Sequence, residues 1–226
     1  TLYETESAIF WNGPSGFSAN RVSRVPTIGA AGNTVGDLDG DGRPEVVFNY
    51  TKSGHLKGIP SYVYLGNPEA RYGTERRLEM PTSGTSTSVV ADLDLDGFPE
   101  MVFTIQGGLR VFRGSARGPR TVGFFDLESA NRSSHNVQVA DFDRDGYLDL
   151  MSVGVVRSEN PAARAKGTTL FFGSREGFPA SRVQYLESYG ESGYLADVNQ
   201  DGFLDILLHD RRDQVLIYLG GPSGYS

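Results

Sequence analysis

An acidic phrase followed at once by an apolar run occurs four times in this chain, and its repetition limits the possible folds more than any other feature. Aligned on the first aspartate, the copies are DLDGDGRPEVVF (37–48), DLDLDGFPEMVF (92–103), DFDRDGYLDLMS (141–152) and DVNQDGFLDILL (197–208). They start 55, 49 and 56 residues apart. A period of this length is typical of proteins built from repeated structural units.

A second phrase, rich in glycine and aromatic residues, recurs on the same period. It reads FWNGPSGFS (10–18), YLGNPEARYG (64–73), VFRGSARGP (111–119), FFGSREGFP (171–179) and YLGGPSGYS (218–226). Two phrases that alternate in constant order are very improbable by chance. The sequence therefore predicts one structural unit per period.

The residues of each period predict short strands. In the first complete period we expect strands at 33–35, 45–50, 61–65 and 76–80, with Gly, Pro and Asn between them. No segment carries a helical period of useful length. Four short strands in about 50 residues match the blade of a propeller, a unit that buries its faces only against its neighbours. We therefore predict an all-β fold, a β-propeller of four-stranded antiparallel blades; a solenoid is the alternative, although its period is usually shorter.

The 226 residues are predicted to form a single β-propeller domain, 1–226. Its repeats are expected at about 1–30 (partial), 31–85, 86–134, 135–190 and 191–226. Four acidic phrases against five glycine-aromatic phrases indicate about four to five blades. Either the chain is a five-bladed ring with two thin blades, or it is part of a larger ring that missing chain or another subunit completes. Because the sequence starts at Thr1 without Met or a leader-like segment, we expect it to be processed or trimmed.

The acidic phrase has the residue types and spacing of a cation-binding loop. Side chains at positions 1, 3 and 5 of a tightly curved loop converge on one point, and Gly at position 6 permits the positive φ that turns the chain. The carbonyl at position 7 and the acid at position 9 close an all-oxygen cage, which suits Ca²⁺ better than Mg²⁺ or Zn²⁺. A bound cation also explains how clustered carboxylates stay ionised. A merely solvated turn is the alternative for one copy, but it does not explain an acid at position 9 in all four.

An EF-hand opens with the same D-x-D-x-D-G pattern but needs a bidentate Glu at position 12. Position 12 is here Phe48, Phe103, Ser152 or Leu208, and the flanking residues are strand-like rather than helical. The phrase resembles instead the FG-GAP (VCBS-type) repeat of the integrin α-subunit β-propeller, and the resemblance extends from Ala8 to the end of the chain. It implies that each loop joins the first two strands of a blade and binds Ca²⁺, about four structural ions in all.

The resemblance also implies which residues hold each ion, namely the side chains at positions 1, 3, 5 and 9 and the carbonyl at position 7. These are Asp37, Asp39, Asp41, Arg43 and Glu45; Asp92, Asp94, Asp96, Phe98 and Glu100; Asp141, Asp143, Asp145, Tyr147 and Asp149; and Asp197, Asn199, Asp201, Phe203 and Asp205. Glu45 and Glu100 replace the family's commoner Asp, so we expect the closing ligand to bind differently there. Asn199 removes one charge, so we expect the fourth site to bind Ca²⁺ most weakly.

The net charge bears on the kind of partner. The formal charge is −7, but the four loops hold 15 of the 28 acidic residues. Four bound Ca²⁺ ions would bring the charge to about +1 and leave a mildly basic outer surface. We therefore expect a protein or glycan ligand and no nucleic acid. No stretch reaches the roughly 20 apolar residues of a membrane span, and the resemblance implies an extracellular, periplasmic or cell-surface location.

The variable loops and one aromatic residue are the candidates for ligand binding. The segments 51–60 and 156–167 differ most in length between repeats, which is where propellers place function. Trp11 stands where other copies of the glycine-aromatic phrase carry Leu or Phe. The candidate residues are Trp11, His55, Lys57, Arg157 and Arg164.

The sequence contains no G-x-S-x-G, no phosphate-binding Gly loop and no H-E-x-x-H, so we predict a non-catalytic, lectin-like or adhesion module. We interpret His135 and His209 as structural. One alternative is the propeller domain of a polysaccharide lyase or hydrolase, with a carboxylate pair drawn from Asp126, Glu128, Glu187 and Glu191. Another is an assembly module, whose open blade edges form an oligomer or complete a ring with another chain.

Overall fold

The chain is all-β in the parts that the structure describes. The computed structural model describes residues 4–50, 58–69, 71–130, 133–154, 166–188, 190–210 and 214–226. Besides strands, these parts contain one short 3₁₀ turn, η1 (Thr74–Arg76). The strands form five antiparallel sheets of two, four, four, four and three strands.

The sheets follow one another along the chain, and within each of them neighbouring strands are consecutive in sequence. The first contains β1 (Glu4–Phe10) and β2 (Val22–Ile28), and the second β3 (Ala30–Gly36), β4 (Glu45–Tyr50), β5 (Ser61–Tyr64) and β6 (Arg77–Met80). The third contains β7 (Ser88–Ala91), β8 (Glu100–Ile105), β9 (Gly108–Phe112) and β10 (Phe125–Glu128). The fourth contains β11 (Ser134–Ala140), β12 (Asp149–Gly154), β13 (Thr168–Phe171) and β14 (Val183–Leu186), and the fifth β15 (Ser192–Ala196), β16 (Asp205–Asp210) and β17 (Gln214–Tyr218).

The second sheet tests the expected strand positions directly. The strand β4 has the expected bounds, β5 begins at Ser61 as expected and β6 ends at Met80 as expected. The first strand, β3, is longer than the expected 33–35 because it pairs with β4 over its whole length, with a register shift between Ala30 and Gly32. The four-stranded antiparallel unit is thus confirmed for the three central sheets.

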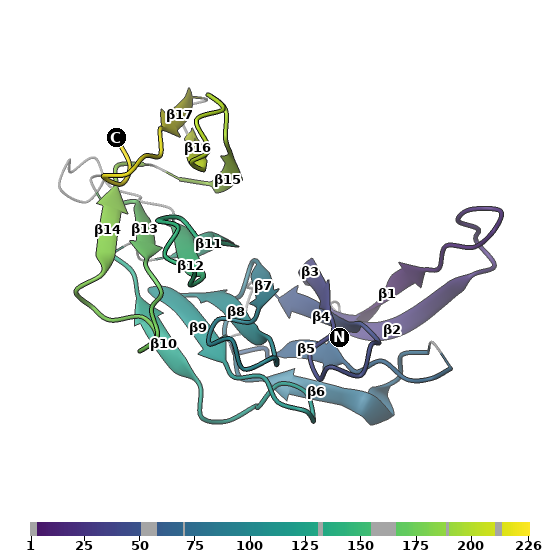
Figure 1. Cartoon of the computed structure of the whole chain (residues 1–226). Coiled ribbons are helices and arrows are strands. Elements are labelled where there is room, and N and C mark those ends of the chain that lie inside the picture. The colour runs from purple at the N-terminus through teal and green to yellow at the C-terminus, as the bar shows by residue number, and fades with distance from the viewer. Residues whose placement is uncertain are drawn as a thin grey trace.

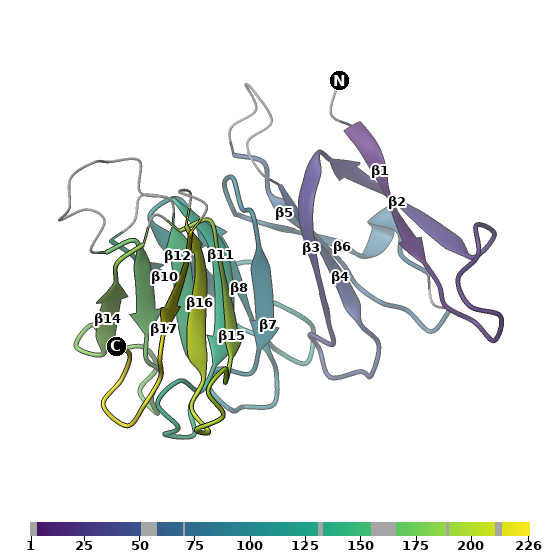
Figure 2. The ribbon, with the colours of Figure 1, turned by 90° about the horizontal axis from the view of Figure 1, so that it is seen from above.

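Consecutive sheets pack against each other in a row (Figures 1 and 2). Four apolar clusters fill the spaces between them. The space between the second and third sheets, for example, contains Val47 and Val63 from one and Met101, Phe103 and Phe112 from the other. A sheet whose inner strands are apolar on both faces needs a neighbour on each side, which is the property of a propeller blade.

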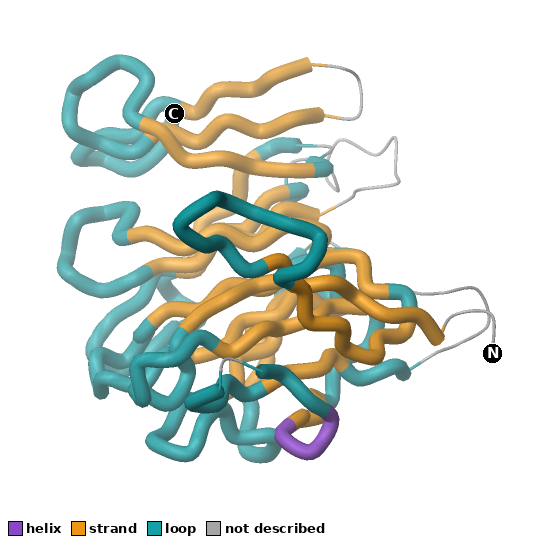
Figure 3. Tube along the Cα trace, turned by 90° about the vertical axis from the view of Figure 1, so that its right-hand side faces the viewer, coloured by secondary structure: helices purple, strands orange, loops and turns teal. Residues whose placement is uncertain are grey.

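The row of sheets does not close on itself in the described part of the chain. The hairpin β1–β2 lies at one end of the row and the sheet β15–β17 lies at the other (Figures 1 and 2). Figure 3 views the row from the side, with many connecting loops gathered at one end of the strands. Ring closure, the number of blades and the single domain therefore stay predictions. None of the described segments forms a helix long and apolar enough to cross a bilayer.

Candidate metal centres

Each acidic phrase forms the loop between the first two strands of a sheet, at β3–β4, β7–β8, β11–β12 and β15–β16. This is the place that the FG-GAP resemblance implies. Strand pairing fixes both ends of each loop; in the first one, Gly36 pairs with Glu45. The residues between these ends must therefore reverse the chain within the width of one strand pair.

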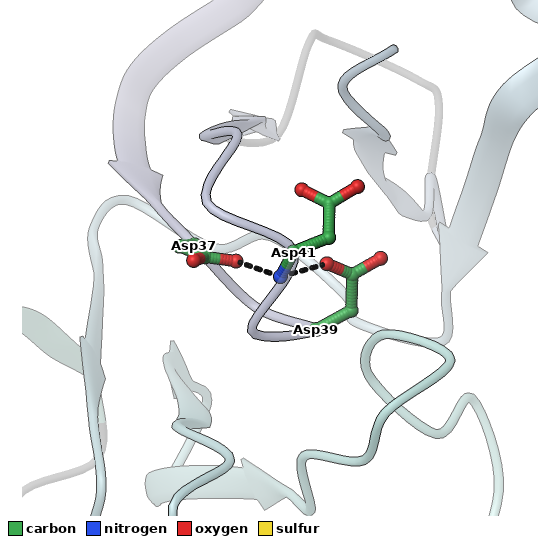
Figure 4. Close-up of side chains that lie close together, drawn as sticks. All are labelled: Asp37, Asp39 and Asp41. Atoms are coloured by element: carbon green, nitrogen blue, oxygen red, sulfur yellow. Dashed lines mark hydrogen bonds between the residues drawn. The ribbon is translucent and has the colours of Figure 1, made fainter. Parts of the chain in front are cut away.

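The carboxylate at position 1 shapes the loop by accepting backbone N–H groups. In the first loop, Asp37 accepts hydrogen bonds from the N–H groups at positions 4, 5 and 6 at 2.9, 3.2 and 2.9 Å. Figure 4 shows that the N–H of Asp41 lies between Asp37 and Asp39 and bonds to both. In the other loops the acid at position 1 accepts the N–H groups of positions 5 and 6 at 2.9–3.1 Å. Local hydrogen bonds of this kind are why Asp is favoured in tight turns.

Two backbone positions of each loop are left-handed. Position 6 is glycine with φ of 81° to 90° in all four copies, which confirms the expected role of this glycine. Position 4 is left-handed too, and it is Gly40 in the first loop but Leu95, Arg144 and Gln200 in the others, with φ of 59° to 63°. No other non-glycine residue with positive φ occurs in the described ranges. Such a backbone costs about 1–2 kcal/mol, and the sequence did not reveal it because a different residue stands at position 4 in each copy.

Three of the four loops bring three carboxylates together. One oxygen from each acid lies within 4.8 Å of the others in the groups Asp37–Asp39–Asp41, Asp92–Asp94–Asp96 and Asp141–Asp143–Asp149. Carboxylate oxygens at this spacing are the ligands that Ca²⁺ takes, so these residues fit the expected ion.

The fourth loop differs as its sequence indicates. Where Asn199 replaces the acid at position 3, the described residues form no such group of three. The Asn199 side chain instead donates a hydrogen bond to Asp201 at 2.8 Å. The weaker binding expected here, and ligation by the position 7 carbonyls of all four loops, stay predictions.

The acid at position 9 is buried and bonded to backbone on two sides. One carboxylate oxygen accepts the N–H of position 2, and the other accepts the N–H of the first glycine in the following glycine-aromatic phrase. The donors are Leu38 and Gly66 to Glu45 (2.7 and 3.0 Å), Leu93 and Gly114 to Glu100 (2.9 and 3.2 Å), Phe142 and Gly173 to Asp149 (2.6 and 2.7 Å), and Val198 and Gly220 to Asp205 (2.8 and 2.9 Å). Each carboxylate oxygen keeps a second lone pair that a metal ion can use. Metal ligation by the position 9 acid stays a prediction.

This bonding explains why the two repeated phrases occur together. The position 9 acid connects the loop to the end of the third strand, and the sequence pattern did not reveal that connection. The close approach also requires the glycine: a Cβ on Gly114 or Gly173 would lie only 2.4 or 2.3 Å from a backbone carbonyl oxygen.

Burial makes the position 9 acids of the first three loops harder to ionise. It raises the pKa of Glu45 and of Glu100, although the backbone N–H donors act in the opposite direction. Burial also raises the pKa of Asp149 to about 7, and the negative charges of Asp143 and Asp145 add to the rise. A cation bound beside these acids would favour their charged form.

Arginine side chains balance part of the negative charge of the loops. Arg182, between β13 and β14, places Nη2 2.6 Å from Asp143 Oδ2 and 2.8 Å from Asp145 Oδ2. Arg182 lies 39 residues beyond Asp143 in the sequence, so no local pattern indicates the contact. Similar pairs in the first two loops are Arg43–Asp41 at 2.7 Å and Arg113–Asp94 at 3.5 Å.

The candidate Trp11 packs between the first two sheets. Its ring stacks on Tyr72, with centroids 5.7 Å apart and planes at 7°, and its Nε1 donates to Ser23 Oγ at 2.9 Å. One face and the only donor of the indole are thus occupied within the protein, and a ligand role for Trp11 stays a prediction. The other candidates, and most of segments 51–60 and 156–167, lie outside the described residues: His55, Lys57, Arg157 and Arg164.

The acids considered for a polysaccharide enzyme include one that is held in an ion pair. Arg110 Nε and Nη2 each lie 2.7 Å from a carboxylate oxygen of Asp126. His135 Nε2 lies 3.1 Å from Ser133 Oγ, and His209 is exposed near the end of β16. The enzymatic alternative stays a hypothesis.

Stacked antiparallel sheets with an acidic loop at the same place in four of them define a repeat protein built from propeller-type blades. Residues 92–152 match the family model of the FG-GAP-like repeat. The match runs from the second acidic phrase to the end of the third. The chain therefore carries FG-GAP-like sequence at 92–152, and for these residues the resemblance read from the acidic phrases is confirmed.

The solved structures that match this chain are distant from it in sequence. A lectin from Agrocybe aegerita, described as recognising non-reducing terminal N-acetylglucosamine, has a TM-score of 0.52 at 12% identity over 100% of this chain. A BBS1N–ARL6DN complex has a TM-score of 0.44 at 12% sequence identity over 88% of this chain. The Photorhabdus luminescens Tc holotoxin pore has a TM-score of 0.38 at 16% sequence identity over 98% of this chain. This chain spans 62%, 66% and 10% of those chains, respectively. No curated protein matches the sequence.

Proposed function

We propose that this chain is a calcium-stabilised, propeller-type binding module that takes a glycan or protein ligand outside the cytoplasm. The observation that carries the proposal is the grouping of three carboxylate oxygens in three copies of one loop. Backbone hydrogen bonds already hold these loops in a curved shape, so little rearrangement is needed when the ion binds. An ion that binds only the folded chain adds its binding free energy to stability.

The role of calcium in this proposal is structural. The grouped side chains supply the negative charge, from positions 1, 3 and 5 in the first two loops and from positions 1, 3 and 9 in the third. The position 9 acid also connects the loop to the third strand of the same sheet. Ordering a loop therefore also orders the far end of that strand. Rigid sheets of this kind are suited to present variable loops to a ligand.

A glycan is the first ligand class to test. The lectin of similar fold is described as recognising non-reducing terminal N-acetylglucosamine, and by analogy we propose a terminal sugar as the ligand. The mildly basic surface left after calcium neutralises the loops adds acidic sugars to the candidates.

A glycan array probed in calcium and again in EDTA tests the proposal. We expect binding to a subset of glycans in calcium and its loss in EDTA. The double variant Asp39→Asn/Asp94→Asn should reduce binding, whereas Glu6→Gln, at an exposed position of β1, should bind as the wild type does. Equal binding in calcium and EDTA would contradict the calcium requirement. Release of shortened glycan from a bound polysaccharide would favour the enzymatic alternative instead.

A further inference from the structure

The apolar clusters between consecutive sheets share one repeated pairing of residue types. It involves the strand that runs into the glycine-aromatic phrase, which is β1, β5, β9, β13 or β17. An aliphatic residue of this strand lies in the same apolar cluster as an aromatic residue of the corresponding strand in the next sheet. In chain order the pairs are Ile9 with Tyr64, Val63 with Phe112, Val111 with Phe171, and Leu170 with Tyr218.

Each of the three inner strands, β5, β9 and β13, contributes to two such pairs. The aliphatic and the aromatic residue are consecutive, as Val63 and Tyr64 are in β5, and consecutive residues of a strand point to opposite faces. The aliphatic residue therefore faces the following sheet and the aromatic residue faces the preceding one. Every sheet thus presents an aliphatic residue of the pair on one face and an aromatic residue on the other.

At the two ends of the row, one member of the pair has no counterpart among the described residues. Phe10 of β1 is the aromatic member without a preceding sheet, and it is 54% exposed. Ile217 of β17 is the aliphatic member without a following sheet, and it is 51% exposed. The equivalent residues inside the row are at most 3% exposed: Val63, Tyr64, Val111, Phe112, Leu170 and Phe171.

Neighbouring side chains extend the exposed face of the last sheet. Val215, on the same strand as Ile217, is 62% exposed, whereas the equivalent residues Ser61, Leu109 and Thr168 are fully buried. Val198, at position 2 of the fourth acidic loop, is also exposed, although the residues at that position in the first three loops are buried. We call Val198, Val215 and Ile217 the C-terminal face.

The opposite end of the row exposes the complementary surface. Phe17, in the first glycine-aromatic phrase, is largely exposed. Its equivalent in the last phrase, Tyr225, packs against Phe142 of the preceding sheet with ring centroids 6.2 Å apart. We call Phe10 and Phe17 the N-terminal face.

We propose that the C-terminal face of one copy of this chain packs on the N-terminal face of a second copy, with Ile217 against Phe10. Each copy carries both members of a pair that occurs in the apolar cluster of every internal interface. The two faces lie at opposite ends of the row, so the contact forms between molecules (Figures 1 and 2). Because the two faces differ, copies add head to tail until a ring closes or a filament grows. The inference depends neither on calcium nor on a ligand.

Sedimentation velocity of the purified chain over a wide concentration range tests this contact. We expect the wild type to associate with rising concentration. The variants Ile217→Lys and Phe10→Lys should each weaken association at least about tenfold, because each buries a charge in the contact. Val122→Lys is the matched control, because Val122 is 74% exposed in the segment before β10 of a central sheet. It should associate as the wild type does.

A mixture of the two variants distinguishes a head-to-tail contact from a symmetric one. Ile217→Lys keeps an intact N-terminal face, and Phe10→Lys keeps an intact C-terminal face. An equimolar mixture should therefore form one-to-one dimers that grow no further. Val215→Lys, as a second variant of the C-terminal face, should behave like Ile217→Lys, and wild-type melting temperatures would exclude unfolding. A wild type that stays monomeric, variants that associate as it does, or a mixture that forms no dimer would each overturn the proposal.

Discussion

Replacing Glu100 by alanine removes the carboxylate that joins the second acidic loop to the end of β9. Its two oxygens accept the N–H groups of Leu93 and Gly114 at 2.9 and 3.2 Å. Glu100 is only 3% exposed, so water does not readily replace the lost acceptor. The substitution therefore leaves two buried N–H groups without the partner they have in the wild type.

The expected loss of stability follows from these two bonds. A hydrogen bond to a charged group contributes about 1.5–3 kcal/mol, so the pair contributes about 3–6 kcal/mol. Burial also raises the pKa of Glu100, which shows that removing its charge from water offsets part of this gain. We expect the free energy of unfolding to fall by about 2–4 kcal/mol in Glu100→Ala. Glu100→Gln keeps one carbonyl oxygen and should lose about half as much.

Urea unfolding followed by circular dichroism in EDTA measures this loss without a contribution from calcium. Glu128→Ala is the control, because Glu128 is an exposed acid on β10 of the same sheet. Its free energy of unfolding should stay within about 0.5 kcal/mol of the wild-type value. If Glu100→Ala proves as stable as this control, the position 9 acid does not hold the loop to the third strand.

Two further predictions concern the calcium affinities of individual loops. Arg182→Ala removes the cation beside Asp143 and Asp145, so calcium affinity at the third loop should rise up to about five-fold in calorimetric titration. Arg175 is exposed and lies, like Arg182, between β13 and β14, so Arg175→Ala should leave the calcium affinity of the third loop unaltered. A lower calcium affinity in Arg182→Ala would contradict competition between the arginine and calcium for the carboxylates. Asn199→Asp restores the acid at position 3 of the fourth loop, so its affinity should rise about tenfold. An unchanged titration would show that charge count does not set the order of the sites.

The sequence predicts most of what is local in this fold. The strand at 45–50, the place of the acidic loops and the left-handed glycine at position 6 follow from patterns within a dozen residues. The repeated phrases also indicate that the first and last units are thinner than the others, and the described sheets there have two and three strands.

The remaining features depend on contacts between distant residues or on backbone shape. Glu45 accepts a hydrogen bond from Gly66, 21 residues further along, and Arg182 reaches back to Asp143. Neither partner is identified by spacing, because the strands between them set the approach. The left-handed residue at position 4, such as Leu95, is imposed by the loop closing around it rather than by its own preference.

Calorimetric titration of calcium into protein first stripped with EDTA tests the central claim most directly. We predict saturable binding of about four ions per chain, one for each acidic loop, with the fourth loop weakest. The same protein should melt at a higher temperature in calcium than in EDTA, because the ion binds the folded chain. Absence of calcium binding, together with the same melting temperature in calcium and in EDTA, would contradict the account.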